Sequence, residues 1–140
     1  MRDFTQWSRV RKLEKHRLPP EIHKVTGQRQ VDFGDCIIKA SDTTIGMRRA
    51  ARNFLTPAGP HIAMGLDGAE ICTISSVSHH ELRKLNKTLS LILEATRSSG
   101  GVYLYLNQQG CDGDRLYYDG CAMIVVNGEI KAQGSHFGLN

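Results

Sequence analysis

Two adjacent histidines and a nearby cysteine are residue types that could bind a metal ion. His79 and His80 follow Cys72 closely in the sequence, and imidazole and thiolate groups are common ligands of transition metals. Neighbouring residues in the first turn of a helix point in different directions, so the two histidines make a poor pair of ligands. We therefore predict no metal site from this group.

Three aspartates could similarly suggest a calcium site. Asp112, Asp114 and Asp119 lie close together, but they lack the long loop pattern ending in glutamate that calcium-binding loops use. Asp112 followed by glycine is typical of a turn, and Arg115 is placed to pair with one of the acids. We predict turn chemistry here and no bound metal.

The cysteines and the absence of apolar runs favour a cytoplasmic protein. The four cysteines have no CxxC spacing, which favours reduced, buried thiols over a disulfide framework. The N-terminus has no apolar segment of the kind found in secretory signals. The chain has no apolar run long enough to span a membrane, so we expect no membrane partner. The cysteines are Cys36, Cys72, Cys111 and Cys121.

Most of the positive charge lies in the first thirty residues. Residues 1–30 hold eight Lys or Arg against three Asp or Glu, whereas residues 31–140 hold ten against eleven. Basic clusters can hold phosphate, but no nucleic-acid-binding motif is present and few aromatic residues accompany the charges. We expect a solvated surface, with nucleic-acid binding as the weaker alternative. The clusters are Arg9, Arg11, Lys12, Lys15 and Arg17, and then Arg48, Arg49 and Arg52.

The elements that must position these residues are clearer after residue 30. Residues 1–30 lack a regular period and contain Pro19-Pro20 and Gly27, so they predict a basic loop or extended arm. Apolar residues over 31–38 predict a first strand, and residues 69–74 predict another. Residues 47–55 favour a short basic helix or turn, and residues 56–60 a loop.

The second half of the chain carries the strongest pattern. Apolar residues at helical spacing predict a helix over 79–98, capped by Ser78 and Glu81 and ended by Gly100-Gly101. A buried strand over 102–106 follows. Segments 118–126 and 129–133 flank Asn127-Gly128, which predicts a type I′ hairpin. The alternation of strands and helices indicates an α/β fold.

The segment from Asn107 to Ser135 closely resembles a stretch near the end of the glutaminase domain of eukaryotic, fungal-like glutamine-dependent NAD synthetases. These domains are nitrilase-like carbon–nitrogen hydrolases. Shorter segments resemble the same family. The resemblance implies that residues 31–140 form the later, incomplete part of an α-β-β-α sandwich, preceded by the basic arm 1–30. The shorter segments are residues 4–9, 33–35, 56–57, 60–62, 64–68, 78–86, 94–97 and 100–105.

The family's chemistry uses a glutamate base, a lysine and a cysteine nucleophile. The thiolate attacks the side-chain amide of glutamine and releases ammonia, while the lysine stabilises the oxyanion. The glutamate and the lysine belong to the earlier part of the family's domain, ahead of the part that this chain resembles. The cysteine belongs between Gly46 and Thr56, where this chain has neither a cysteine nor an acid. Ala50 or Ala51 occupies the nucleophile position, so we expect no glutamine hydrolysis.

The mismatched block over residues 47–55 leaves two explanations open. Selection on a degenerate copy has relaxed, or a pair of compensating frame errors has altered the sequence between two matching flanks. An intact Cys-Glu-Glu pattern at this place in the transcript would favour the second explanation.

The resemblance also implies a place for the amino-acid end of glutamine. Ser78, Arg83 and Lys84 match this place, and a hydroxyl and a cation suit an α-carboxylate. The alternative is a helix cap followed by a solvated basic turn. ATP and magnesium would belong to the family's separate synthetase domain, so we expect no cofactor here. As an alternative function, an uncovered half-sandwich would dock on a full-length paralogue as a homo- or hetero-oligomer.

Overall fold

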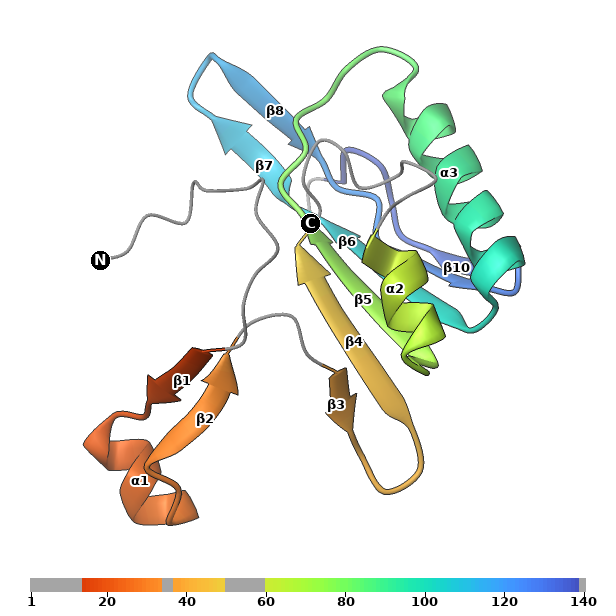
Figure 1. Cartoon of the computed structure of the whole chain (residues 1–140). Helices are drawn as coiled ribbons and strands as arrows, with labels where there is room; N and C mark the ends of the chain where they lie inside the picture. The colour runs from red at the N-terminus through yellow and green to blue at the C-terminus, as the bar shows by residue number, and fades with distance from the viewer. Residues whose placement is uncertain (1–13, 34–36, 50–59, 139–140) are drawn as a thin grey trace. The chain divides into compact units, whose positions relative to one another are not determined.

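The computed structural model describes residues 14–33, 37–49 and 60–138. The chain divides into two compact units between Cys36 and Ile37, and each is described by itself. Figure 1 shows the elements of both units.

The first unit is a small hairpin that carries a helix in its loop. Strands β1 (Glu14–Arg17) and β2 (Gln30–Phe33) pair antiparallel, and α1 (Pro20–Thr26) connects them. The expectation of a loop or extended arm is therefore wrong for these residues. Pro20 lies in the first turn of α1, where its missing N–H costs no hydrogen bond. Gly27 (φ 72°) ends the helix, so the residues that looked like breakers are start and stop signals.

The basic residues of this hairpin are exposed, as the sequence predicts. All four residues of β1, including Lys15 and Arg17, are exposed. Arg9, Arg11 and Lys12 lie outside the described residues.

The second unit is built on a mixed six-stranded sheet with the order β10-β9-β6-β5-β4-β3. The three central strands β4, β5 and β6 run parallel, and the outer pairings are antiparallel. The α/β prediction is confirmed. The strands are β3 (Ile37–Lys39), β4 (Thr44–Arg49), β5 (Ile71–Ser76), β6 (Val102–Asn107), β9 (Met123–Val126) and β10 (Glu129–Gln133).

Two helices, α2 (Pro60–Leu66) and α3 (Lys84–Ser99), cover one face of this sheet (Figure 1). Because side chains alternate along a strand, every second residue of β5, β6 and β9 faces the helices. Tyr103 and Val125 meet Ile92 of α3 there, and all three are almost fully buried. Gly46 of β4 faces Met64 of α2 at close range. The core therefore lies in one layer between the helices and the sheet.

The strands after residue 30 differ from the sequence prediction in two places. The expected strand over 31–38 is divided, because β2 belongs to the first unit and β3 to the sheet. The expected basic helix over 47–55 is wrong at its start, since β4 continues to Arg49 and pairs with β5. Residues 50–59 lie outside the described part of the chain, and Pro60 begins α2.

The long helix begins five residues later than its apolar pattern predicts. Its cap is Arg83, in the left-handed conformation (φ 64°), and no side chain caps it. The capping box of Ser78 and Glu81 is therefore wrong. The physical reason is tertiary pairing: His79 bridges Tyr118, so this segment is extended. The helix ends at Gly100, as predicted.

The predicted type I′ hairpin is confirmed. Asn127 (φ 49°) and Gly128 (φ 81°) join β9 to β10 with the two positive φ angles that this turn requires. A register shift interrupts β10 between Ile130 and Ala132. The expected strand over 118–126 is broken at Gly120 and Cys121, which also have positive φ. Its first residues belong to a separate ribbon of β7 (Gln109–Asp112) and β8 (Leu116–Asp119).

The thiols match the expectation of burial in part. Cys72 and Cys121 are free and buried, whereas Cys111 is free and exposed. Among the described residues, no helix has the length and apolar character needed to cross a membrane.

Candidate functional site

The carboxyl ends of the parallel strands β4, β5 and β6 meet at one edge of the sheet, where α/β folds commonly place their sites. The register pairs Arg49 of β4 with Ser75 of β5, and Ser76 with Asn107 of β6. The nucleophile position, Ala50 or Ala51, follows β4 directly in the sequence but lies outside the described residues. Ser78 follows β5. Of these two predicted positions, the structure therefore places only Ser78, just beyond the carboxyl end of β5.

The structure fixes Ser78 by its backbone. The side chain of Asn107 accepts a hydrogen bond from the Ser78 N–H at 2.9 Å and donates one to the Ser78 carbonyl at 3.0 Å. This pair of bonds joins the segment after β5 to the end of β6. Ser78 is partly buried, and its role in binding stays a prediction.

The two predicted cations differ in their surroundings. Arg83 is exposed at the start of α3. Lys84 forms an ion pair with Glu81, and its Nζ also donates to the His79 carbonyl at 3.3 Å. Lys84 therefore links the residues of the turn before α3 to one another. Glutamine binding by Arg83 and Lys84 stays a prediction.

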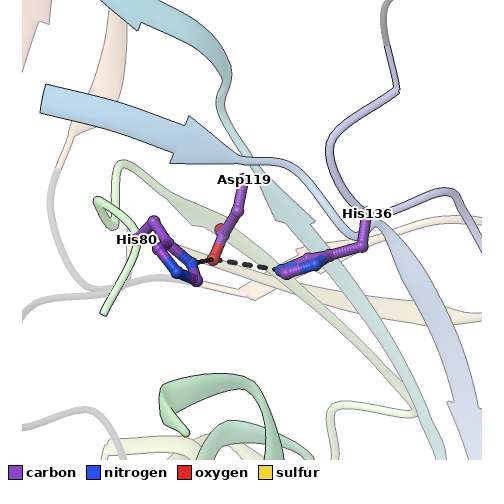
Figure 2. A group of neighbouring side chains, drawn as sticks. All are labelled: His80, Asp119 and His136. Carbon is purple, nitrogen blue, oxygen red and sulfur yellow. Dashed lines mark hydrogen bonds and ion pairs between the residues drawn. The ribbon is translucent and has the colours of Figure 1, made fainter. Parts of the chain in front are cut away.

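A cluster that the sequence patterns did not single out lies next to Ser78. His80, Asp119 and His136, here called the His–Asp–His cluster, come from the segment before α3, the end of β8 and the segment after β10. Figure 2 shows both imidazole rings directed at the Asp119 carboxylate. His80 Nδ1 lies 3.1 Å from Asp119 Oδ2, and His136 Nε2 lies 3.2 Å from the same oxygen.

Strand β8 holds the three residues together through the backbone. The His80 N–H donates to the Tyr117 carbonyl at 2.6 Å, and the Phe137 N–H donates to the Asp119 carbonyl at 3.0 Å. His136 also forms a bridge with Gly120. The Phe137 ring lies 4.8 Å from the His80 ring and 4.4 Å from the His136 ring, measured between centroids. The cluster is therefore fixed by strand pairing and by the contacts of the Phe137 ring with both imidazoles.

The Asp119 carboxyl is buried but ionised at neutral pH. Burial acts to raise its pKa, but the hydrogen bond with His80 and the nearby charge of His136 outweigh burial and hold the pKa below its usual value. Asn107 Nδ2 also donates to Asp119 Oδ1 at 2.9 Å. Asn107 thereby links the carboxylate to Ser78, so the cluster and the predicted substrate position share one hydrogen-bond network.

The structure groups Asp119 differently from the sequence reading. Asp119 lies with two histidines, and not in a turn with Asp112 and Asp114. Asp112 pairs with Arg115 at 2.8 Å, which confirms the predicted ion pair. Cys72 is buried in the core, whereas His79 Nε2 lies 3.2 Å from Glu81. No local spacing could have revealed the His–Asp–His cluster, because strand pairing alone brings its members together.

The chain matches the carbon-nitrogen hydrolase family over residues 4–140. It belongs to that family. It is 64% identical over 140 residues to the glutamine-dependent NAD(+) synthetase of Saccharomyces cerevisiae, and 51% identical over 140 residues to that of Homo sapiens. The chain spans 20% of the length of each relative. The resemblance inferred from the sequence is confirmed.

Solved structures agree on the fold. A glutamine-dependent NAD(+) synthetase from Cytophaga hutchinsonii superposes with a TM-score of 0.72 at 18% identity, over 92% of this chain and 19% of that one. A carbon-nitrogen hydrolase from Helicobacter pylori G27 gives a TM-score of 0.61 at 20% identity, over 69% of this chain and 38% of that one. At these identities the likeness shows the fold alone, and the nitrilase-like assignment is confirmed.

Proposed function

We propose that this chain corresponds to part of the glutaminase domain of a glutamine-dependent NAD synthetase and does not hydrolyse glutamine by itself. One observation carries the proposal: the sequence between Gly46 and Thr56, which begins within β4 and continues beyond its last residue, Arg49, contains no cysteine. An alanine methyl at residue 50 or 51 cannot ionise or form a thioester. The covalent step of the family therefore has no nucleophile at that position.

The described cysteines are poor substitutes for this nucleophile. Cys72 is 4% exposed, and burial raises the pKa of its thiol, which disfavours the reactive thiolate. Cys121 is 2% exposed and accepts a hydrogen bond from Gln133. Cys111 is exposed but belongs to the β7–β8 ribbon. Cys36 lies outside the described residues, in a segment that matches a different part of the family.

Incubation with glutamine tests the proposal. We expect no release of glutamate above a heat-treated control. We also expect a glutamine-mimicking electrophile to leave no adduct that glutamine competes away, as measured by mass spectrometry. The Ala50→Cys and Ala51→Cys variants show whether a thiol at either position becomes reactive. Turnover, or a competed adduct on the unaltered chain, would contradict the proposal.

A second candidate function is a non-catalytic module that docks on a full-length paralogue. The observation that favours it is the face of the sheet opposite the helices. Strand register places a row of apolar side chains on this open sheet face. The side chains of Ile38, Met47, Leu106 and Ile124 are 41–64% exposed, and that of Leu104 is partly buried. We call Ile38, Met47, Leu104, Leu106 and Ile124 together the open sheet face; on the same side of the sheet lie the partly buried Ile45, Ile71, Val102 and Val126.

An exposed apolar surface of this kind is typical of an interaction site. We expect the chain to bind a full-length paralogue or itself in light-scattering measurements. A stable monomer that ignores the paralogue would contradict this second function while leaving the first proposal intact.

A further inference from the structure

We propose that His80, Asp119 and His136 form a binding site for a divalent transition metal ion, with Zn²⁺ as the reference ion. The site would bind metal whether or not the chain acts on glutamine.

The donor atoms suit such an ion. Two imidazole nitrogens and one carboxylate oxygen are a frequent set of three protein ligands for zinc and its neighbours, with the remaining coordination positions open to water. Asp119 supplies a carboxylate oxygen, the negatively charged donor of the set. The rings are accessible from solvent, because the His80 and His136 side chains are 34% and 29% exposed.

The distances are close to those of a metal centre. His80 Nδ1 and His136 Nε2 lie 3.1 and 3.2 Å from Asp119 Oδ2, and one donor atom from each residue lies within 4.8 Å of the others. With metal–ligand bonds of about 2.0–2.2 Å, neighbouring ligand atoms in a tetrahedral site are separated by roughly 3.4 Å. Two of the separations already fit, so small side-chain rotations would suffice to enclose an ion.

One buried atom lacks a well-formed partner. His136 Nε2 is buried and makes no hydrogen bond of acceptable geometry, although it lies 3.2 Å from the carboxylate. The two facts agree if the distance is short but the direction is unsuitable for an N–H···O bond. A buried nitrogen without a partner is costly. A metal ion between the ring and Oδ2 would use the nitrogen lone pair and remove this cost.

The surroundings hold the carboxylate in a suitable orientation. Asn107 donates to Oδ1 at 2.9 Å, which leaves Oδ2, the oxygen that both histidines approach, available to the ion. Hydrogen bonds from residues behind the ligands commonly orient them and raise metal affinity. The Phe137 ring packs edge-on against both imidazoles and limits their rotation. Asn107 is therefore a positioning residue for the site.

The experiment uses the full chain with Zn²⁺ in isothermal titration calorimetry and with Co²⁺ in visible absorption spectroscopy. We expect saturable binding of one equivalent. His136→Gln and Asp119→Asn should each weaken binding by at least about tenfold, and should remove the absorption of the low-symmetry Co²⁺ complex. His79→Gln is the matched control, because His79 is adjacent to His80 and pairs with Glu81 outside the cluster. The His79→Gln variant should bind Zn²⁺ with the affinity of the unaltered chain.

Asn107→Ala should weaken Zn²⁺ binding by about tenfold while preserving the Co²⁺ spectrum, which a residue with no role in the site would not do. Cys111→Ser excludes capture by the exposed thiol and should bind normally. Because Asp119→Asn could unfold the ribbon, His80→Gln and His136→Gln, at partly exposed positions, carry the test if it does. Absence of saturable binding, equal binding by the His136→Gln variant, or an equal loss in His79→Gln would overturn the proposal.

Discussion

Tyr103 carries a hydroxyl group into the centre of the core, where it is 1% exposed. The hydroxyl interacts with Ser99 and Cys72 but makes no hydrogen bond of good geometry. Burial, followed by the charge of Cys72, raises the pKa of Tyr103 to about 12. The folded state therefore holds the neutral phenol far more strongly than the unfolded chain does.

This raised pKa predicts a loss of stability in alkali. The contribution of Tyr103 is complete below the ordinary value of 10.0 and is lost as the pH rises toward about 12. The shift corresponds to about 2–3 kcal/mol. The free energy of unfolding of the Tyr103→Phe variant should fall less steeply as the pH rises through this window, as measured by urea denaturation at several pH values. Tyr117→Phe, at an exposed position, is the control and should retain the steep loss.

Ile92 tests the packing of the same core. Its side chain is fully buried between α3 and the sheet. Ile92→Ala should lower the free energy of unfolding by about 2–5 kcal/mol, because it leaves a cavity that the surrounding residues fill only in part. The matched control is Leu82→Ala, at a position that is 90% exposed. Similar losses in the two variants by urea denaturation would contradict the core described here.

At the scale of elements, Gly101 sets the junction between α3 and β6. Its φ is 83°, and a Cβ at this position would lie 2.6 Å from the Glu70 carbonyl oxygen. That oxygen accepts a hydrogen bond from Val102, so it cannot move away without breaking the start of β6. Both the backbone conformation and the space therefore require glycine here.

Gly101→Ala and Gly68→Ala separate these two requirements. Gly68 has a similar φ of 89° but nothing within 4 Å of its Cβ position. Gly68→Ala should cost about 1–2 kcal/mol, from the left-handed conformation alone. Gly101→Ala should cost clearly more, since the steric clash is added. Thermal and urea unfolding measure both, and equal losses would show that the close approach to Glu70 is not rigid.

How far the sequence predicts an element depends on how local its cause is. The hairpin at Asn127-Gly128 and the end of α3 at Gly100 were predictable, because both depend on glycine conformation within a few residues. The start of α3 was not, because pairing with β8 keeps residues 78–80 extended. The His–Asp–His cluster was hidden for the same reason. The nucleophile position came from family resemblance, and no pattern within the chain marks it.

At the scale of the whole molecule, the second unit has one covered and one open sheet face. The helices bury alternate residues of β5, β6 and β9, whereas the open sheet face keeps Met47 at 64% and Leu106 at 53% exposed. Apolar area that remains in contact with water favours association. The sheet therefore presents a surface on which another molecule can pack.

Polar substitutions on the open sheet face should reduce association. We expect the double variant Leu106→Ser and Ile124→Thr to lower the mass-average particle size in light scattering, because it removes apolar area from the surface that would be buried. Leu66→Ser is the control, since Leu66 is 84% exposed but lies on α2. An equal decrease in particle size for Leu66→Ser would indicate non-specific hydrophobic association and would contradict association through this face.

The two lateral strands of the sheet decide how such association can occur. Strand β3 has only three residues, and β10 is interrupted by its register shift beside Lys131. Edge strands that are short, or that carry a bulge and a lysine, are poor templates for pairing with a further strand. We therefore expect neighbouring molecules to pack face to face against this sheet, and not to extend it into fibrils by adding strands at its edges.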